Sequence, residues 1–273
     1  MLTRIREGLE WRWFLATRTR FLRKTFRNGD ELVKSYLSKT PCDEAICRDG
    51  TVIRHAPGRT GLAGMILEVW FEEVYTGTFY TPRVGDTIVD AGANIGLFSL
   101  LVARRYPGAR VLSFEPFEEN YTLLNENVRS ARTSAVQTFR HALSGKRGVS
   151  VMIDGGDRSQ DHRLTSPAVP EGDSRAVPTC TLADVLAMSE VDSLALFKCD
   201  IEGSEFDLFT EAADRDLHRV HRYAIEYHDN LRPGTLALLR ERLGPSHVLV
   251  EKPSREGGYG MLYATRKSVS AGI

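Results

Sequence analysis

A glycine-rich loop between an apolar strand and an apolar helix constrains this chain more than any other feature. Residues 89–96 read Val-Asp-Ala-Gly-Ala-Asn-Ile-Gly, with a strand predicted at 87–91 and a helix at 96–106. Gly92 and Gly96 let the backbone turn sharply and bring its amides close to a ligand, because no Cβ stands in the way. In an open α/β sheet such a loop lies where the strand order reverses and ligands bind. The loop therefore predicts a ligand site at a sheet edge.

Strand-like and helix-like segments alternate from Asp86 onward, which predicts a mostly parallel sheet with helices on both faces. Strands are expected at 87–91, 110–115, 135–141, 149–153, 194–200 and 222–227, and helices at 96–106, 118–131, 182–188, 204–213 and 234–243. The last two strands, at 247–252 and 259–265, flank a Gly-Gly turn and predict one antiparallel strand in the sheet. The fold class is a doubly wound α/β fold.

The first 80 residues follow a different pattern and predict a helical extension or cap on a main domain at 81–273. Apolar residues at helical spacing predict a helix over 1–40, ending before Pro41, then a strand pair near 51–55 and a helix at 62–75. Residues 154–178 show no periodic pattern, so we expect a long loop there, either functional or merely disordered surface.

Charge and cysteine usage narrow the function classes. Lys+Arg and Asp+Glu are equal at 36 each, which argues against nucleic acid as partner. Residues 1–28 are nevertheless rich in arginine and carry Trp11 and Trp13, so this helix either packs across the main domain or contacts a membrane surface.

The cysteines lack metal-site spacing, and no apolar run is long enough to span a bilayer. We expect a cytoplasmic protein, and the oligomeric state stays open.

The loop spacing favours one nucleotide cofactor over another. Gly92 and Gly96 are separated as G-x-x-x-G, unlike the G-x-G-x-x-G of dinucleotide-binding folds. Asp90 at the strand end would repel a pyrophosphate and favour the cationic methionine part of S-adenosylmethionine. The alternatives are an NAD-dependent Rossmann-fold oxidoreductase and a non-catalytic scaffold that binds a cofactor.

Glu115 ends the next strand, where a carboxylate accepts hydrogen bonds from both hydroxyls of a ribose. Pro116 and Phe117 would then wall the adenine. The competing interpretation is an acid that only stabilises the N-terminus of a helix.

Acidic residues follow two later strands. Asp200, Glu202 and Glu205 end one strand, and Glu226 with His228 ends the next. Carboxylates packed together need a cation or hydrogen-bond donors, so we expect Asp200, Glu202, Glu226 and His228 on one rim of the sheet. Alternatively, Ser204 or Glu205 simply caps a helix. Among these side chains His228 or Asp200 is the candidate general base, and Glu202 and Glu226 would position an acceptor or a divalent ion. Mg²⁺ is possible, but no spacing demands a metal.

These motifs together resemble the FkbM family of methyltransferases. The likeness spans residues 84–265 and rests on the loop, on Phe114-Glu115-Pro116 with Asn120, and on the two acidic blocks. It implies a class I methyltransferase fold with a seven-stranded sheet, and O-methylation of a hydroxyl on a sugar, glycolipid or natural product.

The residues that the resemblance assigns to S-adenosylmethionine are Asp90, Gly92, Asn94, Gly96, Glu115, Pro116, Phe117, Asn120 and Asp200. Cys199 and Ser204 depart from the usual family residues. A small-molecule or glycan acceptor is expected rather than nucleic acid, because no N-P-P-Y or D-P-P-Y motif for an extruded base follows Asp200.

Overall fold

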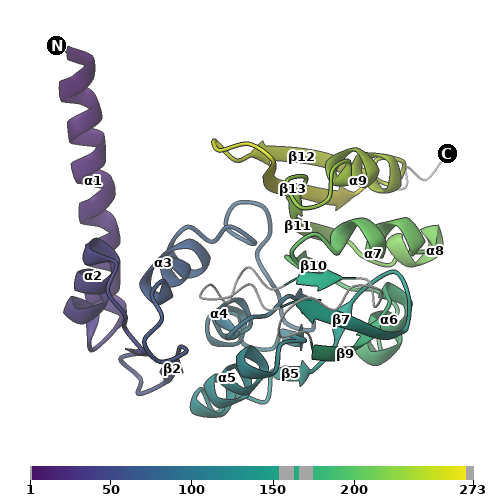
Figure 1. The fold of residues 1–273 in the computed structure, drawn as a ribbon, viewed down its shortest axis with the longest axis horizontal. Helices are drawn as coiled ribbons and strands as arrows, with labels where there is room; N and C mark the ends of the chain where they lie inside the picture. The colour runs from purple at the N-terminus through teal and green to yellow at the C-terminus, as the bar shows by residue number, and fades with distance from the viewer. Residues whose placement is uncertain (1, 154–162, 166–174, 269–273) are drawn as a thin grey trace.

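A seven-stranded sheet forms the centre of the computed structural model, which describes residues 2–153, 163–165 and 175–268 (Figure 1). Its strands lie in the order β12-β13-β11-β10-β3-β4-β5. Their bounds are β3 Thr87–Ala91, β4 Arg110–Phe114, β5 Val136–Phe139, β10 Leu196–Cys199, β11 Arg222–His228, β12 His247–Pro253 and β13 Tyr259–Arg266. Strands β5, β4, β3, β10 and β11 pair in parallel, and β13 pairs antiparallel with both β11 and β12. The expected doubly wound sheet with one antiparallel strand is confirmed.

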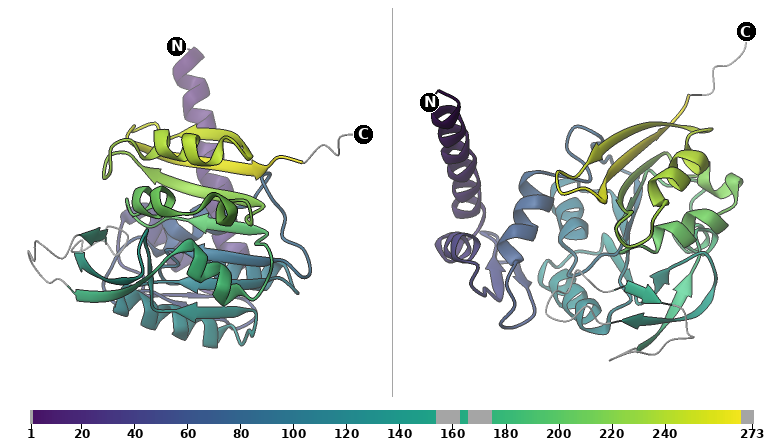
Figure 2. Two further views of the ribbon diagram at one scale, coloured as in Figure 1. Left: turned by 90° about the vertical axis from the view of Figure 1, so that its right-hand side faces the viewer. Right: turned by 45° about the horizontal axis from the view of Figure 1, so that its top comes forward.

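Helices cover both faces of this sheet (Figures 1 and 2). One face packs against α6 (Leu182–Ser189), α7 (Glu205–Glu211) and α9 (Thr235–Leu243), with α8 (Asp214–Leu217) beside them. The other face packs against α4 (Leu97–Arg105) and α5 (Glu118–Ser130). The central strands are apolar on both sides, as parallel strands between two helical layers must be.

Strand periodicity determines where the polar side chains gather. On β3, Val89 and Ala91 belong to the core under α6 and α7, whereas Ile88 belongs to the core under α4. Successive side chains alternate between faces, so Asp90 shares the α4 face with Ile88. The same alternation places Lys198 of β10 and Glu226 of β11 on that face, because their neighbours Leu196 and Ala224 lie in the α4 core. Register and periodicity thus bring polar residues from three strands together.

The N-terminal extension contains two helices where a single one was expected. The prediction of one helix over 1–40 is wrong: α1 (Leu2–Thr25) ends and α2 (Gly29–Ser38) begins after a turn in which Phe26 forms a bridge with Cys47. A Cβ at Gly29 would lie 2.5 Å from the Cα of Arg23, so the close approach of α1 and α2 requires glycine. This contact between helices leaves no local sequence signal.

Helix α1 stands clear of the sheet domain, and only its C-terminal end enters a core (Figures 1 and 2). Leu22 and Phe26 are fully buried there, whereas Trp13 is 71% exposed. Packing of the whole helix across the domain is therefore wrong. Membrane contact through residues 1–28 stays a prediction. Among the described helices, none combines the length and apolar character that crossing a bilayer requires.

The rest of the extension packs on the sheet domain. A hairpin of β1 (Glu44–Ile46) and β2 (Val52–Arg54) precedes α3 (Leu62–Ile66), which continues as a π-helical turn, η1 (Leu67–Phe71). The apolar side chains of these elements form one core with Ile95, Leu97, Leu100 and Leu101 at the start of α4. The extension is therefore anchored beside the glycine-rich loop.

A second, four-stranded sheet lies next to the main one, in the order β6-β9-β7-β8. Its strands are β6 Ala142–Leu143, β7 Gly148–Ile153, β8 Arg163–Thr165 and β9 Arg175–Cys180. The expectation of a loop throughout 154–178 is wrong where β8 and β9 lie, and its remainder falls outside the described residues. Proline is rare inside a sheet, so the presence of Pro178 argued against a strand at β9. In the structure Pro178 nevertheless pairs with Val149.

Candidate active site

A cavity of about 500 Å³ opens at the carboxyl ends of β3, β10 and β11. Four parts of the chain line it: the turn after β3 with the start of α4, the segments at the ends of β10 and β11, the turn between β12 and β13 with the start of β13, and the N-terminal extension. The lining residues are Met65, Glu68, Val69, Tyr75, Gly92, Ala93, Asn94, Ile95, Leu97, Phe98, Lys198, Asp200, Glu202, Glu226, His228, Asn230, Glu256 and Tyr259. This is the edge at which doubly wound sheets bind ligands.

The turn after β3, residues 91–96, is here called the glycine loop. Gly92 has a φ of 73°, and a Cβ there would lie 1.7 Å from the backbone oxygen of Asp200. Gly96 has a φ of 90°, and its Cβ would lie 2.6 Å from Cδ1 of Leu124. No larger residue fits at Gly92 without moving the backbone that carries Asp200.

Asn94 is the polar side chain of the glycine loop. It adopts a left-handed conformation with a φ of 50°, and its backbone N–H donates to Glu115 Oε2 at 2.8 Å. Its buried side-chain oxygen Oδ1 has no hydrogen-bond partner among the described residues. A buried acceptor without a donor is unfavourable, so a ligand N–H or O–H or a water is the natural partner.

Both carboxylate oxygens of Asp90 contact other side chains of the protein. Its Oδ1 lies 3.1 Å from Lys198 Nζ, and its Oδ2 accepts a hydrogen bond of 2.6 Å from Ser99. Burial alone would lower the pKa of Lys198, but the carboxylates of Asp90 and Asp200 outweigh it and raise that pKa. Asp90 is therefore paired with Lys198, and its expected attraction for the cationic cofactor stays a prediction.

Glu115 lies directly after β4 and holds the glycine loop through a hydrogen bond. It is 5% exposed and accepts hydrogen bonds from the backbone amides of Asn94 and Phe117, at 2.8 Å and 2.9 Å. Burial raises the pKa of Glu115 to about 7, although these two hydrogen bonds oppose the rise.

The remaining residues expected around the adenosine lie near Glu115. Phe117 is buried against Ala142 and Val177, so protein covers its ring. Asn120 is buried and Pro116 is half-buried. Glu115 and these three residues do not line the cavity described above. Their contacts with a cofactor stay predictions.

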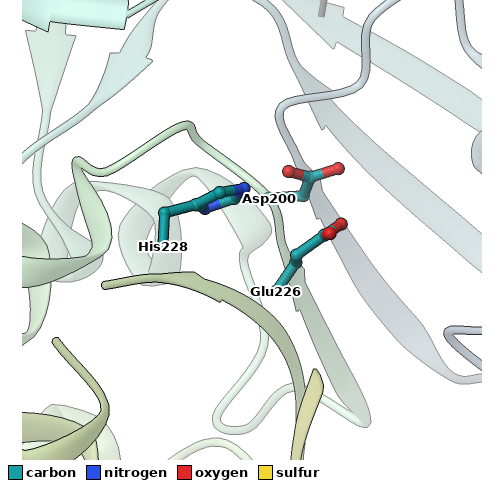
Figure 3. A group of neighbouring side chains, drawn as sticks. All are labelled: Asp200, Glu226 and His228. Carbon is teal, nitrogen blue, oxygen red and sulfur yellow. The ribbon is translucent and has the colours of Figure 1, made fainter. Parts of the chain in front are cut away.

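Asp200, Glu202, Glu226 and His228, here called the acid cluster, meet at one rim of the sheet as expected (Figure 3). The side chains of Asp200, Glu226 and His228 point toward one another, each offering a ligand atom within 4.8 Å of the other two. His228 Nε2 lies 3.4 Å from Glu202 Oε2, and its Nδ1 lies 3.2 Å from Glu205 Oε1. Glu205 thus contacts His228 in addition to starting α7.

The acid cluster concentrates negative charge in a partly buried space. Burial raises the pKa values of Glu202 and Glu226, and the nearby carboxylate of Asp200 raises both further. Burial would lower the pKa of His228, but Glu205, Asp200 and Glu202 together raise it to about 10. The surrounding carboxyl groups therefore stabilise the protonated imidazole of His228.

Backbone conformation also holds the cluster in place. Glu202 has a φ of 51°, an uncommon conformation for a residue with a Cβ, and Gly203 follows with a φ of 90°. Such strain persists only where the surroundings enforce it.

Three residues of the site lay outside the sequence prediction. Lys198 was detectable as the one charged residue in the apolar strand Leu196–Cys199. Tyr75 donates a hydrogen bond of 2.9 Å to Asp200 Oδ2, and Glu68 lines the cavity from the π-helical turn. Neither has a signal in the sequence, because both belong to the extension and reach the cavity only in the folded chain.

Comparison with known families decides among the expected classes of protein. The model described as the Methyltransferase FkbM domain matches residues 90–247, more than half of the chain. The chain belongs to the FkbM methyltransferase family. The matched stretch of this FkbM protein includes the whole glycine loop, Glu115 and the whole acid cluster. Its sheet is that of a class I methyltransferase, as the resemblance implied, and an NAD-dependent oxidoreductase is no longer a competing interpretation.

Individual relatives agree with this family. The FkbM chain is 26% identical over 192 residues to the 31-O-demethyl-FK506 methyltransferase FkbM of Streptomyces tacrolimicus, covering 58% of this chain and 74% of the relative. It is 29% identical over 186 residues to the methyltransferase sdnD of Sordaria araneosa, covering 57% and 72%. Among solved structures, magnesium protoporphyrin IX methyltransferase from Synechocystis PCC 6803 with bound SAM has 12% identity and a TM-score of 0.44, covering 75% of this chain and 79% of that one.

Proposed function

We propose that this protein transfers a methyl group from S-adenosylmethionine to a hydroxyl of a sugar, glycolipid or natural product. The observation that carries the proposal is the contact between the glycine loop and the acid cluster. Gly92 lies against the backbone of Asp200, so a cofactor on the loop would face the carboxylates directly.

The residues of the loop fit S-adenosylmethionine. Gly92 leaves room for a close backbone approach, Asn94 offers a buried unpaired oxygen, and Glu115 is a buried carboxylate beside them. When bound, the cofactor supplies a methyl group on a positively charged sulfur. The negative acid cluster favours that charge, in the role that the sequence had assigned to Asp90.

The acid cluster is the proposed place for the acceptor hydroxyl. An alcohol is a poor nucleophile at neutral pH, so a neighbouring group must take its proton during the attack. Of the two expected bases we assign the role to Asp200, because it lines the cavity directly against Gly92 of the glycine loop. Tyr75 holds one oxygen of Asp200, and Glu202 and Glu226 would position the acceptor.

The relatives support a natural-product acceptor. The name 31-O-demethyl-FK506 methyltransferase describes methylation of an oxygen on a natural product. We extend that class to this chain, and we retain sugars and glycolipids because the lining of the cavity is strongly polar.

Calorimetric titration with S-adenosylhomocysteine tests the cofactor, with NAD⁺ as comparison ligand. We expect saturable binding of S-adenosylhomocysteine that weakens in Glu115→Gln, and no heat with NAD⁺. Absence of binding by the intact, folded chain would refute the proposal.

Incubation with methyl-labelled cofactor and a panel of hydroxylated acceptors separates an enzyme from a cofactor-binding scaffold. Label in an ether product, lost in Asp200→Asn, is the expected outcome. Tight cofactor binding without any product across the panel would favour the scaffold.

A further inference from the structure

More carboxyl groups than cationic side chains line the cavity. Five carboxylates line it, those of Glu68, Asp200, Glu202, Glu226 and Glu256. The cationic side chains of the lining are Lys198 and His228. Lys198 is shared between Asp90, the backbone oxygens of Ala91 and Gly92 at 3.1 Å and 2.7 Å, and Asp200, whose Oδ2 lies 4.0 Å away. Such an arrangement is stabilised by a further cation.

Three of these side chains have the spacing of ligands around one ion. The ligand atoms of Asp200, Glu226 and His228 all lie within 4.8 Å of one another. Ligands at about 2.1 Å from an octahedral ion are roughly 3 to 4.2 Å apart, so a small contraction brings all three into contact with it. Glu226 makes no hydrogen bond or ion pair with any described residue, and its carboxylate is therefore available.

His228 is held in the orientation of a metal ligand. Its side chain is 8% exposed, and Nδ1 lies 3.2 Å from Oε1 of the fully buried Glu205. The same Oε1 accepts a hydrogen bond of 3.0 Å from the backbone N–H of Ile201, which fixes Glu205. Metal-bound histidines almost always donate their second ring N–H to such an outer acceptor. Nε2 is thereby directed toward Asp200 and Glu226, as Figure 3 shows, and a bound cation would take the place of the Nε2 proton.

We propose that Asp200, Glu226 and His228 bind a divalent cation, of the class of Mn²⁺ rather than Mg²⁺. Carboxylates suit Mg²⁺ and Mn²⁺ alike, but an imidazole ligand favours the first-row transition ions. Three protein ligands on one side leave the other positions open to the cavity, as in catalytic metal sites. Such an ion would hold the acceptor hydroxyl and lower its pKa, which deepens the proposed function. Binding itself does not depend on that function.

Manganese titration of the full chain, stripped with a chelator, tests the site. Electron paramagnetic resonance of free Mn²⁺ is expected to show saturable binding of one ion. Glu226→Gln keeps the size of the side chain and breaks no described hydrogen bond, so it should fold normally, and it should weaken binding at least about tenfold. Glu256→Gln removes the same charge from the same cavity without removing a proposed ligand, and its affinity should equal that of the parent chain.

The histidine ligand has a spectroscopic signature of its own. Electron spin echo modulation from an imidazole nitrogen should accompany bound Mn²⁺ and disappear in His228→Gln. If Glu226→Gln and Glu256→Gln weaken Mn²⁺ binding equally, the ion is attracted by the general negative charge and the proposed ligand set is wrong. Absence of binding at millimolar Mn²⁺ would also overturn the proposal. Titration of the same samples with S-adenosylhomocysteine distinguishes the two proposals. Failure to bind Mn²⁺ with normal binding of S-adenosylhomocysteine refutes only the metal site, and the reverse result refutes only the proposed function.

Discussion

Lys198 and Asp90 form an ion pair across adjacent strands, at directly opposed register positions of β10 and β3. Both side chains are almost completely buried, and the same ammonium group donates to the backbone oxygens of Ala91 and Gly92. Lys198 therefore joins the end of β3, the glycine loop and the acid cluster into one electrostatic unit.

Lys198→Met should destabilise the protein strongly, because it leaves the Asp90 carboxylate buried without a counter-charge. Breaking a buried pair from one side costs about 3–5 kcal/mol. Lys198→Met combined with Asp90→Asn should recover part of this loss, since the double variant buries no charge. Urea denaturation of the parent chain and the two variants measures the effect. Equal stabilities of Lys198→Met and the parent chain would show that the pair is unimportant.

Gly92→Ala should abolish binding of S-adenosylhomocysteine. The new Cβ would lie 1.7 Å from the backbone oxygen of Asp200, so the glycine loop must move. Gly58→Ala is the matched control, because Gly58 has a φ of 72° against 73° for Gly92 but has nothing within 4 Å of its Cβ. Gly58→Ala should cost only the backbone strain, about 1–2 kcal/mol, and leave binding unchanged. Calorimetry and urea denaturation separate the two effects.

Cofactor affinity should rise with pH through the titration of Glu115. Burial raises the pKa of this group to about 7, and ribose hydroxyls donate more strongly to its ionised form, which offers both oxygens as acceptors. Protonation below about pH 7 therefore weakens binding, by up to about tenfold between about pH 8 and pH 6. In Glu115→Gln this component of the pH dependence should vanish. A variant with the same slope as the parent chain would assign the titration to another group.

Asp184→Asn should weaken the start of α6. Asp184 and Thr181 form a reciprocal capping box, and Arg147 pairs with the same carboxylate. The side-chain hydrogen bond from Arg147 contributes most to lowering the pKa of Asp184 to about 2, so its contribution is complete above its ordinary value of 3.8 and is lost as the pH falls through about 2. We expect a loss of about 1 kcal/mol at neutral pH, because Arg147 is largely exposed. The difference in urea midpoint between the parent chain and Asp184→Asn should disappear as the pH is lowered toward about 2.

The central sheet could be predicted because each of its elements carries a local signal. Thr87–Ala91 and Leu196–Cys199 are short apolar strands that end in acids, and helical periodicity follows the first. Parallel strands place such ends at one edge, so the meeting of Asp200 with Glu226 and His228 followed from topology.

The remaining features depend on contacts between distant residues. The break between α1 and α2 reflects the approach of Gly29 to Arg23, and β9 is concealed by Pro178. The ion pair of Asp90 with Lys198 on the neighbouring strand was likewise not predicted, because the two residues are far apart in the sequence. Tyr75 reaches Asp200 from 125 residues away in the chain, a pairing that no window of sequence contains.

Tyr75 and Glu68 also lie before residue 90, where the match to the family begins. The part of the cavity lined by Glu68 and Tyr75, here called the wall, therefore comes from chain that the family model leaves out. The part formed by the glycine loop and the ends of β10 and β11, here called the floor, comes from chain that it includes. The two parts can diverge separately, since a change in the wall leaves the glycine loop and the strand ends untouched. A graft of residues 1–86 from another family member would reshape the entrance for the acceptor and keep the floor of this protein.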